Sequence, residues 1–88
     1  NPSFFMEIII YSQQGCSYCE HMKELCNRAN VSYKEVLVDV DIPKHVFTKE
    51  FPQAKSYPFV VIDDKRIGGL VEAAKYFIQE GLVSAKRK

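Results

Sequence analysis

Residues 11–22 read YSQQGCSYCEHM, and this stretch decides the fold. It contains Cys16 and Cys19, two of the three cysteines in the chain, separated by two residues. The β-branched run before it, over residues 7–11, is typical of a strand buried on both faces. From residue 17 to residue 29, apolar side chains recur at the spacing of an amphipathic helix. The cysteine pair therefore lies where a strand gives way to a helix.

The rest of the chain alternates between strand and helix patterns. β-Branched and aromatic runs predict strands, whereas an early proline and a late asparagine or glycine mark the ends of helices. The expected strands cover residues 7–11, 31–40, 59–62 and 66–67. The expected helices cover residues 17–29 with Asn30 as a left-handed cap, residues 43–51 with Pro43 in the first turn, and a last segment from Gly68-Gly69 to a cap at Gly81. In the last helix, the residues expected to face inward are Leu70, Ala73, Ala74, Phe77 and Ile78.

This order of elements, β-α-β-α-β-β-α, predicts an α/β fold. The first two strands are joined by a helix and should be parallel with a right-handed crossover. The last two should form an antiparallel hairpin. The expected architecture is a mixed four-stranded sheet with three helices on its faces.

Composition and charge exclude several functional classes. Hydrophobic residues make up 47% and charged residues 26% of the 88 residues, which are ordinary values for a small globular domain. The formal net charge of +1 predicts neither nucleic acid nor a membrane as a partner, and no apolar run approaches the roughly 20 residues of a membrane span. Three cysteines do not make a disulfide framework, so we expect a cytoplasmic protein.

We expect one domain over residues 6–83, acting as a monomer. Residues 1–5 are interpreted as a cloning remnant or a disordered start, because Met6 opens the first patterned segment. Residues 84–88 are interpreted as a basic, solvated tail.

A metal site is the first interpretation of the cysteine pair to consider, because Cys16, Cys19, His21 and Cys26 are four candidate ligands. On a helix, Cys19 and Cys26 would lie roughly 10 Å apart, too far to share one ion with ligand bonds near about 2.3 Å. His21 would point away from Cys19, since two residues advance a helix by about 200°. We therefore expect no protein-only metal site. Cys26 is interpreted as a core residue, and His21 and His45 as surface residues.

A reversible disulfide suits the pair better. A bridge between Cys16 and Cys19 closes too short a loop to stabilise the fold much, yet residues three apart at a helix start lie about 5–6 Å apart, within disulfide geometry. Cys16 would lie beside unpaired N–H groups at the positive end of the helix, which favour thiolate over thiol. We therefore predict that Cys16 is the nucleophile and that the more shielded Cys19 attacks second.

Three motifs, in this order and at this spacing, resemble the glutaredoxin family: Cys16-Ser17-Tyr18-Cys19, then Ser56-Tyr57-Pro58, then Ile67-Gly68-Gly69. The resemblance runs from about residue 7 to residue 82 and looks like the compact dithiol glutaredoxins. It implies a thioredoxin-like fold and a glutathione-dependent thiol–disulfide oxidoreductase. Such an enzyme would reduce protein disulfides and glutathione mixed disulfides through Cys16 and Cys19. The implied partners are glutathione and disulfide-containing or glutathionylated client proteins, with ribonucleotide reductase as one candidate client.

The resemblance also implies how glutathione, as co-substrate, would bind. Tyr57-Pro58 would be a cis peptide bond beside the cysteine pair, presenting the Tyr57 backbone to a peptide in strand-like pairing. Tyr18 would line the groove, and N–H groups at the start of the last helix would hold the γ-glutamyl carboxylate. The implied glutathione-binding residues are Gln13, Tyr18, Tyr57, Pro58, Gly69, Val71 and Glu72.

Four positions depart from the family pattern. Gln13 replaces a lysine that often stands three residues before the first cysteine, which should weaken binding of the glycyl carboxylate. Tyr57 stands where Thr-Val-Pro usually has valine, and a bulky ring should reshape the groove. Leu70-Val71-Glu72 replaces a more polar run ending in aspartate, and Ser17 replaces the common proline.

Two alternative functions remain open. Some glutaredoxins with Cys-Ser-Tyr-Cys hold a [2Fe-2S] cluster between two subunits, with glutathione supplying other ligands. Cys16 would then be a ligand in a cluster carrier or sensor. The other alternative is a thioredoxin-like reductant served by a flavoprotein reductase. The lack of tryptophan and the Ser-Tyr pair inside the motif, in place of Gly-Pro, speak against it.

Overall fold

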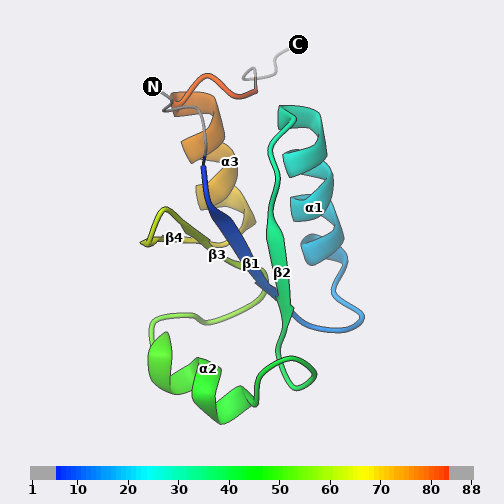
Figure 1. Ribbon diagram of the computed structural model, residues 1–88, viewed down its shortest axis with the longest axis vertical. Helices are drawn as coiled ribbons and strands as arrows, with labels where there is room; N and C mark the ends of the chain where they lie inside the picture. Colours follow the sequence, from blue (N-terminus) through cyan, green and yellow to red (C-terminus); the bar gives the residue numbers. More distant parts are fainter. Residues whose placement is uncertain (1–5, 84–88) are drawn as a thin grey trace.

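Residues 6–83 are described in the computed structural model, and they form a four-stranded sheet with three helices (Figure 1). In chain order the elements are β1 (Ile8–Ser12), α1 (Ser17–Ala29), β2 (Lys34–Leu37), α2 (Lys44–Glu50), β3 (Phe59–Ile62), β4 (Lys65–Gly68) and α3 (Leu70–Gln79). The predicted order is confirmed. The expected start at 1–5 and basic tail at 84–88 lie outside the described residues. Among the described helices, none is both long and apolar enough to cross a bilayer.

The sheet has the strand order β2-β1-β3-β4 and is mixed, as predicted. β1 runs parallel to β2 and antiparallel to β3, and β3 and β4 form an antiparallel hairpin. The two residues between β3 and β4, Asp63 and Asp64, both have positive φ, at 50° and 67°. Two such residues make the tight turn whose twist matches a right-handed pair of strands.

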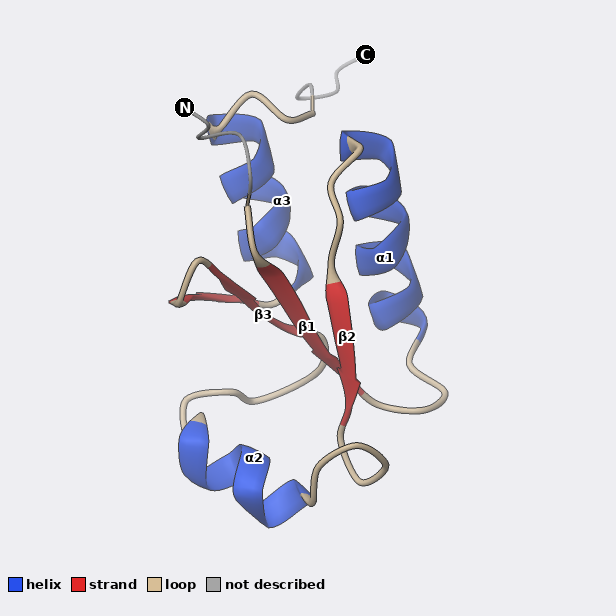
Figure 2. Cartoon of the chain, in the orientation of Figure 1, coloured by secondary structure: helices blue, strands red, loops and turns tan. Residues whose placement is uncertain are grey.

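The main core lies between the sheet and the helices α1 and α3, which pack side by side (Figure 2). Side chains alternate across a strand, so every second residue of β1 points into this core. Its buried members are Ile8, Ile10, Met22, Cys26, Val60, Ile62, Ala73 and Phe77. This core holds the start of α1, and with it the cysteine pair, against the end of β1.

A second, largely aromatic cluster lies on the other face of the sheet and is formed by Val38, Phe47, Phe51, Phe59 and Val61. Helix α2 provides Phe47 and its C-cap residue is Phe51, but the helix has only seven residues and lies beyond the ends of the strands (Figure 1). Residues 9 and 11 of β1 are therefore only half-buried on this face. The prediction that β1 is buried on both faces is wrong for the second face, because α2 is too short to cover it.

Helices α1 and α3 end as the sequence predicts. Asn30, with φ 59°, and Gly81, with φ 75°, both adopt the left-handed conformation. In each case this residue and the next donate their N–H groups to carbonyls in the last turn of the helix. These bonds satisfy carbonyl groups that the helix leaves without partners.

Three predicted details are wrong. Strand β2 is shorter than residues 31–40, because Asp39 turns the chain with φ 73° soon after the strand ends. Pro43 is the N-cap of α2 and not part of its first turn. Ile78 is 40% exposed, because it lies about 100° around α3 from the fully buried Phe77.

Phe77→Ala tests which face of α3 is in the core. We expect this change to lower the free energy of unfolding by about 3–5 kcal/mol, because Phe77 is 0% exposed and its loss leaves a cavity. The neighbouring Ile78→Ala should cost less than about 1 kcal/mol. Urea unfolding of both variants measures the difference, and equal losses would contradict the assigned orientation of α3.

Candidate active site

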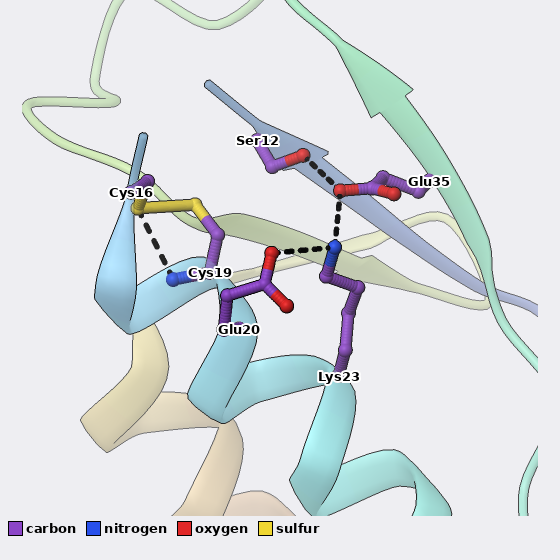
Figure 3. The surroundings of a disulfide bond; sticks show 6 residues. All are labelled: Ser12, Cys16, Cys19, Glu20, Lys23 and Glu35. Carbon is purple, nitrogen blue, oxygen red and sulfur yellow. Dashed lines mark hydrogen bonds and ion pairs between the residues drawn. A yellow bond between two sulfur atoms is a disulfide. The ribbon is translucent and has the colours of Figure 1, made fainter. Parts of the chain in front are cut away.

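Cys16 lies at the junction of a turn and a helix. Strand β1 ends at Ser12, the turn passes through Gly15 at φ 76°, and Cys16 is the N-cap of α1. Its Sγ accepts a hydrogen bond from the backbone N–H of Cys19 at 3.1 Å (Figure 3). Oxygen-bearing residues usually cap helices in this way. Here a sulfur atom accepts one of the N–H groups that the first turn leaves without a partner.

Cys16 and Cys19 are joined as a disulfide, with their Cα atoms 5.2 Å apart. The predicted proximity of the pair is confirmed. Cys19 is only 1% exposed and packs beneath the first turn, whereas Cys16 is half-buried. A substrate approaching from solvent therefore meets the Cys16 sulfur first.

A chain of polar side chains lies next to the disulfide (Figure 3). The hydroxyl of Ser12, which is 0% exposed, donates to Glu35 Oε2 at 2.6 Å. Lys23 Nζ lies 3.0 Å from the same Glu35 oxygen and 2.9 Å from Glu20 Oε2. This chain, which we call the Ser12–Glu35 network, joins the end of β1, strand β2 and the second turn of α1.

The network shifts the pKa values of its own charged members. The hydrogen bond from Ser12, together with Lys23, lowers the pKa of Glu35 below its ordinary value of 4.5. Hydrogen bonds to Glu20 and Glu35 raise the pKa of Lys23. Both shifts favour the charged forms, so the network is an ion pair at neutral pH.

Sequence reasoning missed the Ser12–Glu35 network. The spacing of Glu20 and Lys23, three residues apart on α1, was the only local signal. Glu35 is 23 residues from Ser12 in the chain and reaches it only because β1 and β2 pair in parallel. Predicting that contact would have required knowing the register of β1 and β2.

A groove of about 350 Å³ lies beside Tyr18 of α1, between the segment before β3 and the start of α3. It is lined by Tyr18, Ser56, Tyr57, Pro58, Gly69, Leu70, Val71 and Glu72. The structure thus gathers six of the seven predicted glutathione-binding residues around one cavity. The seventh, Gln13, is exposed in the turn after β1 and does not line the groove. The peptide bond between Tyr57 and Pro58 is cis, as expected.

Glu72 forms the polar end of this groove. Its Oε1 accepts a hydrogen bond from the N–H of Gly69, the N-cap of α3, at 3.0 Å. The preceding Gly68 has φ 125°, and a Cβ there would lie 3.1 Å from the Glu72 side chain. Glycine is needed at position 68 for both reasons. The carboxylate of Glu72 therefore already caps the helix end to which an anionic ligand was expected to bind.

The remaining candidate side chains lie away from the groove. Cys26 is 0% exposed in the main core, and burial raises the pKa of its thiol to about 11, so it stays protonated at neutral pH. His21 and His45 are exposed. Over residues 6–83, no three or more His, Cys, Asp or Glu side chains gather in a way that could hold a metal ion.

A family profile and several known proteins with similar sequences identify the family of this chain. The sequence profile of the Glutaredoxin family matches residues 8–67. Glutaredoxin 1 of Rickettsia conorii is 32% identical over 71 residues, covering 78% of this chain and 70% of the relative. Glutaredoxin 1 of Rickettsia typhi is 34% identical over 71 residues, covering 78% and 68%.

A solved structure supports the same grouping. The crystal structure of Glutaredoxin 1 from Francisella tularensis, complexed with cacodylate, superposes with a TM-score of 0.73 at 28% identity. The superposition covers 88% of this chain and 96% of that one. The predicted thioredoxin-like fold is confirmed.

Ser12→Ala tests whether the Ser12–Glu35 network holds the end of β1. We expect the free energy of unfolding to fall by about 1.5–3 kcal/mol, because a buried hydrogen bond to a charged group is lost. Ser32→Ala, at an exposed position between α1 and β2, should change it by less than about 0.5 kcal/mol. Thermal or urea unfolding measures both, and a silent Ser12→Ala would contradict this role.

We expect the ionisation of Glu35 to contribute to the pH dependence of stability. A carboxyl whose pKa is lowered by folding contributes stability that is fully present above its unfolded pKa, ordinarily 4.5, and that is lost as the pH falls through the lower folded value. Glu35→Gln should therefore flatten the loss of stability below pH 4.5 relative to the unmodified chain. Urea unfolding at a series of acidic pH values measures this slope, with exposed Glu24→Gln as the matched control. Parallel slopes in the unmodified chain and Glu35→Gln would contradict the lowered pKa.

Proposed function

The chain belongs to the glutaredoxin family and is a glutathione–disulfide oxidoreductase, and we propose that Cys16 and Cys19 together reduce protein disulfides and glutathione mixed disulfides. The observation that carries this proposal is the hydrogen bond from the Cys19 N–H to Cys16 Sγ at the first turn of α1. A donor at that place stabilises negative charge on the sulfur more than it stabilises a neutral thiol. Cys16 is therefore the attacking thiolate.

The first half of the reaction consumes the substrate disulfide. The Cys16 thiolate attacks one sulfur of the substrate, forms a mixed disulfide with it and releases the other sulfur as a thiolate, which takes up a proton. Cys19 then loses its proton and attacks Cys16, forming the Cys16–Cys19 disulfide and releasing the second substrate thiol. Two electrons have passed from the two cysteines to the substrate.

The second half restores the enzyme. One glutathione thiolate attacks Cys16 and frees Cys19, and a second glutathione attacks the resulting adduct and leaves as glutathione disulfide. Two glutathione molecules thus return the two electrons. On a glutathione mixed disulfide, glutathione can resolve the Cys16 adduct directly, and Cys19 is then dispensable.

The groove provides the docking site in this proposal. A tripeptide would extend along Tyr57 and Pro58, with its sulfur directed toward Cys16, and would contact Tyr18 and Val71 at its sides. Gly69 and Glu72 would bound its γ-glutamyl end. A reducing, glutathione-rich compartment such as the cytoplasm is the setting in which this cycle runs in the reductive direction.

The two alternative hypotheses predict different results in simple assays. A thioredoxin-like reductant would receive electrons from a flavoprotein thioredoxin reductase and not from glutathione. A cluster carrier would show visible absorbance and dimerise after anaerobic purification with glutathione. Turnover supported by glutathione, from a colourless monomer, would contradict both alternatives.

Cysteine substitutions test the assigned roles. Cys16→Ser should reduce turnover of a glutathione mixed disulfide to the uncatalysed rate, because the nucleophile is gone. Cys19→Ser should keep that activity but lose most of the reduction of protein disulfides, which needs the second sulfur. Cys26→Ala is the matched control and should keep both activities, because Cys26 is buried away from the groove.

Two outcomes would contradict these assignments. Activity retained in Cys16→Ser would refute the nucleophile, and activity lost in a folded Cys26→Ala would show that a third cysteine takes part. Circular dichroism of each variant establishes that the chain has folded.

A further inference from the structure

The aromatic cluster on the second face of the sheet meets the groove at Tyr57. This residue lines the groove, and it also packs against the cluster, with its ring centroid 5.6 Å from that of Phe47. Phe47 is 4% exposed and belongs to α2, although none of the described residues of α2 lines the groove. Helix α2 is therefore in contact with a residue of the groove without being part of it.

Phe47 is the central ring of this cluster. Besides Tyr57, it lies 5.2 Å from Tyr11, 5.5 Å from Phe51 and 6.1 Å from Phe59, measured between ring centroids. Aromatic rings at these separations attract one another beyond the effect of burying their surfaces. The ring of Tyr57 is thus held by a residue whose own position is fixed by three other rings.

Polar contacts attach α2 at its two ends. At the start, the N–H of Lys44 donates to Asp39 Oδ1 at 3.0 Å, and at the end Glu50 lies 3.5 Å from Arg66 of β4. These contacts are exposed, so water and salt weaken them. The middle of the helix, which lies beyond the ends of the strands (Figure 1), is held in place by the buried ring of Phe47.

The side chain at position 57 makes this contact possible. The usual family pattern, Thr-Val-Pro, would place a valine there, which has no ring to pair with Phe47. Burial, and then the charge of Asp39, raise the pKa of Tyr57 above its ordinary value of 10.0, so the ring is uncharged at neutral pH. An uncharged ring at this position joins the groove to α2.

We propose that Phe47 is a positioning residue for the groove, and that it acts by holding the ring of Tyr57. This inference rests on the proposed function, in which the glutathione moiety extends along Tyr57 and Pro58. Phe47 touches neither the substrate nor the sulfurs in this role. Its loss should therefore weaken docking, which changes KM, and leave the exchange of sulfurs at Cys16, which sets kcat, intact.

Phe47→Leu tests the proposal, with Phe51→Leu as the matched control. Both changes remove a buried ring from the same cluster, but in the described chain the Phe51 ring pairs with Tyr11, Phe47 and Phe59 and not with Tyr57. We expect KM for a glutathione mixed disulfide to rise about three- to tenfold in Phe47→Leu and less than about twofold in Phe51→Leu. In both variants kcat should stay within about twofold of the unmodified chain.

A double-mutant cycle with Tyr57→Val assigns the effect to the ring. If Phe47 acts through Tyr57, the rise in KM caused by Phe47→Leu should shrink to less than about twofold once position 57 has no ring. A general loosening of the cluster would instead raise KM by the same factor in both backgrounds.

The outcomes separate the inference from the proposed function. An unchanged KM in folded Phe47→Leu, equal rises in Phe47→Leu and Phe51→Leu, or a rise that persists in full with Tyr57→Val would overturn the positioning role while the oxidoreductase stands. Absence of turnover in the unmodified chain would overturn the proposed function itself. If Phe47→Leu does not fold by circular dichroism, the milder pair Phe47→Met and Phe51→Met provides the same comparison.

Discussion

The N–H groups in the first turn of a helix have no acceptor within the helix and must find one elsewhere. In this chain, one of those groups is bonded to the sulfur of Cys16, the residue that also meets the substrate. The same contact therefore serves the fold and the chemistry. When Cys16 is a thiolate, it is a better acceptor than a thiol, so capping of α1 and ionisation of the sulfur favour one another. A cap of serine would satisfy the helix equally well but could not exchange disulfides.

The position of that cap depends on elements distant in the sequence. The turn before Cys16 is anchored at its other end by Ser12, whose hydroxyl is bonded to Glu35 on the neighbouring strand. Lys23 then connects Glu35 to Glu20 on α1 itself. The two ends of the turn are thus tied to the same polar network, while Met22 and Cys26 fix the inner face of α1 in the core. The network thus joins two strands to the helix that begins beside the reactive sulfur.

Local sequence patterns predicted much of the fold but only part of the site. The bounds of α1 and β3 and the left-handed caps at Asn30 and Gly81 follow from residue types that favour one backbone conformation. The partial exposure of β1 did not follow, because it depends on how far α2 reaches across the sheet. The family resemblance, and not a local pattern, predicted that Tyr57 and Val71 would lie at one groove. The Ser12–Glu35 contact could not be predicted from the sequence, because nothing local distinguishes Glu35 from any other glutamate on a strand.

Glu72 shows how one side chain can both secure the start of a helix and line a groove. A carboxylate at the third position of a helix is favourable for stability, because it accepts the N–H of the cap residue and lies at the positive end of the helix. Glutamate reaches back to Gly69, and Gly68 leaves just enough room for its methylene groups. The contact therefore secures the start of α3 and holds the Glu72 carboxylate at the edge of the adjacent groove.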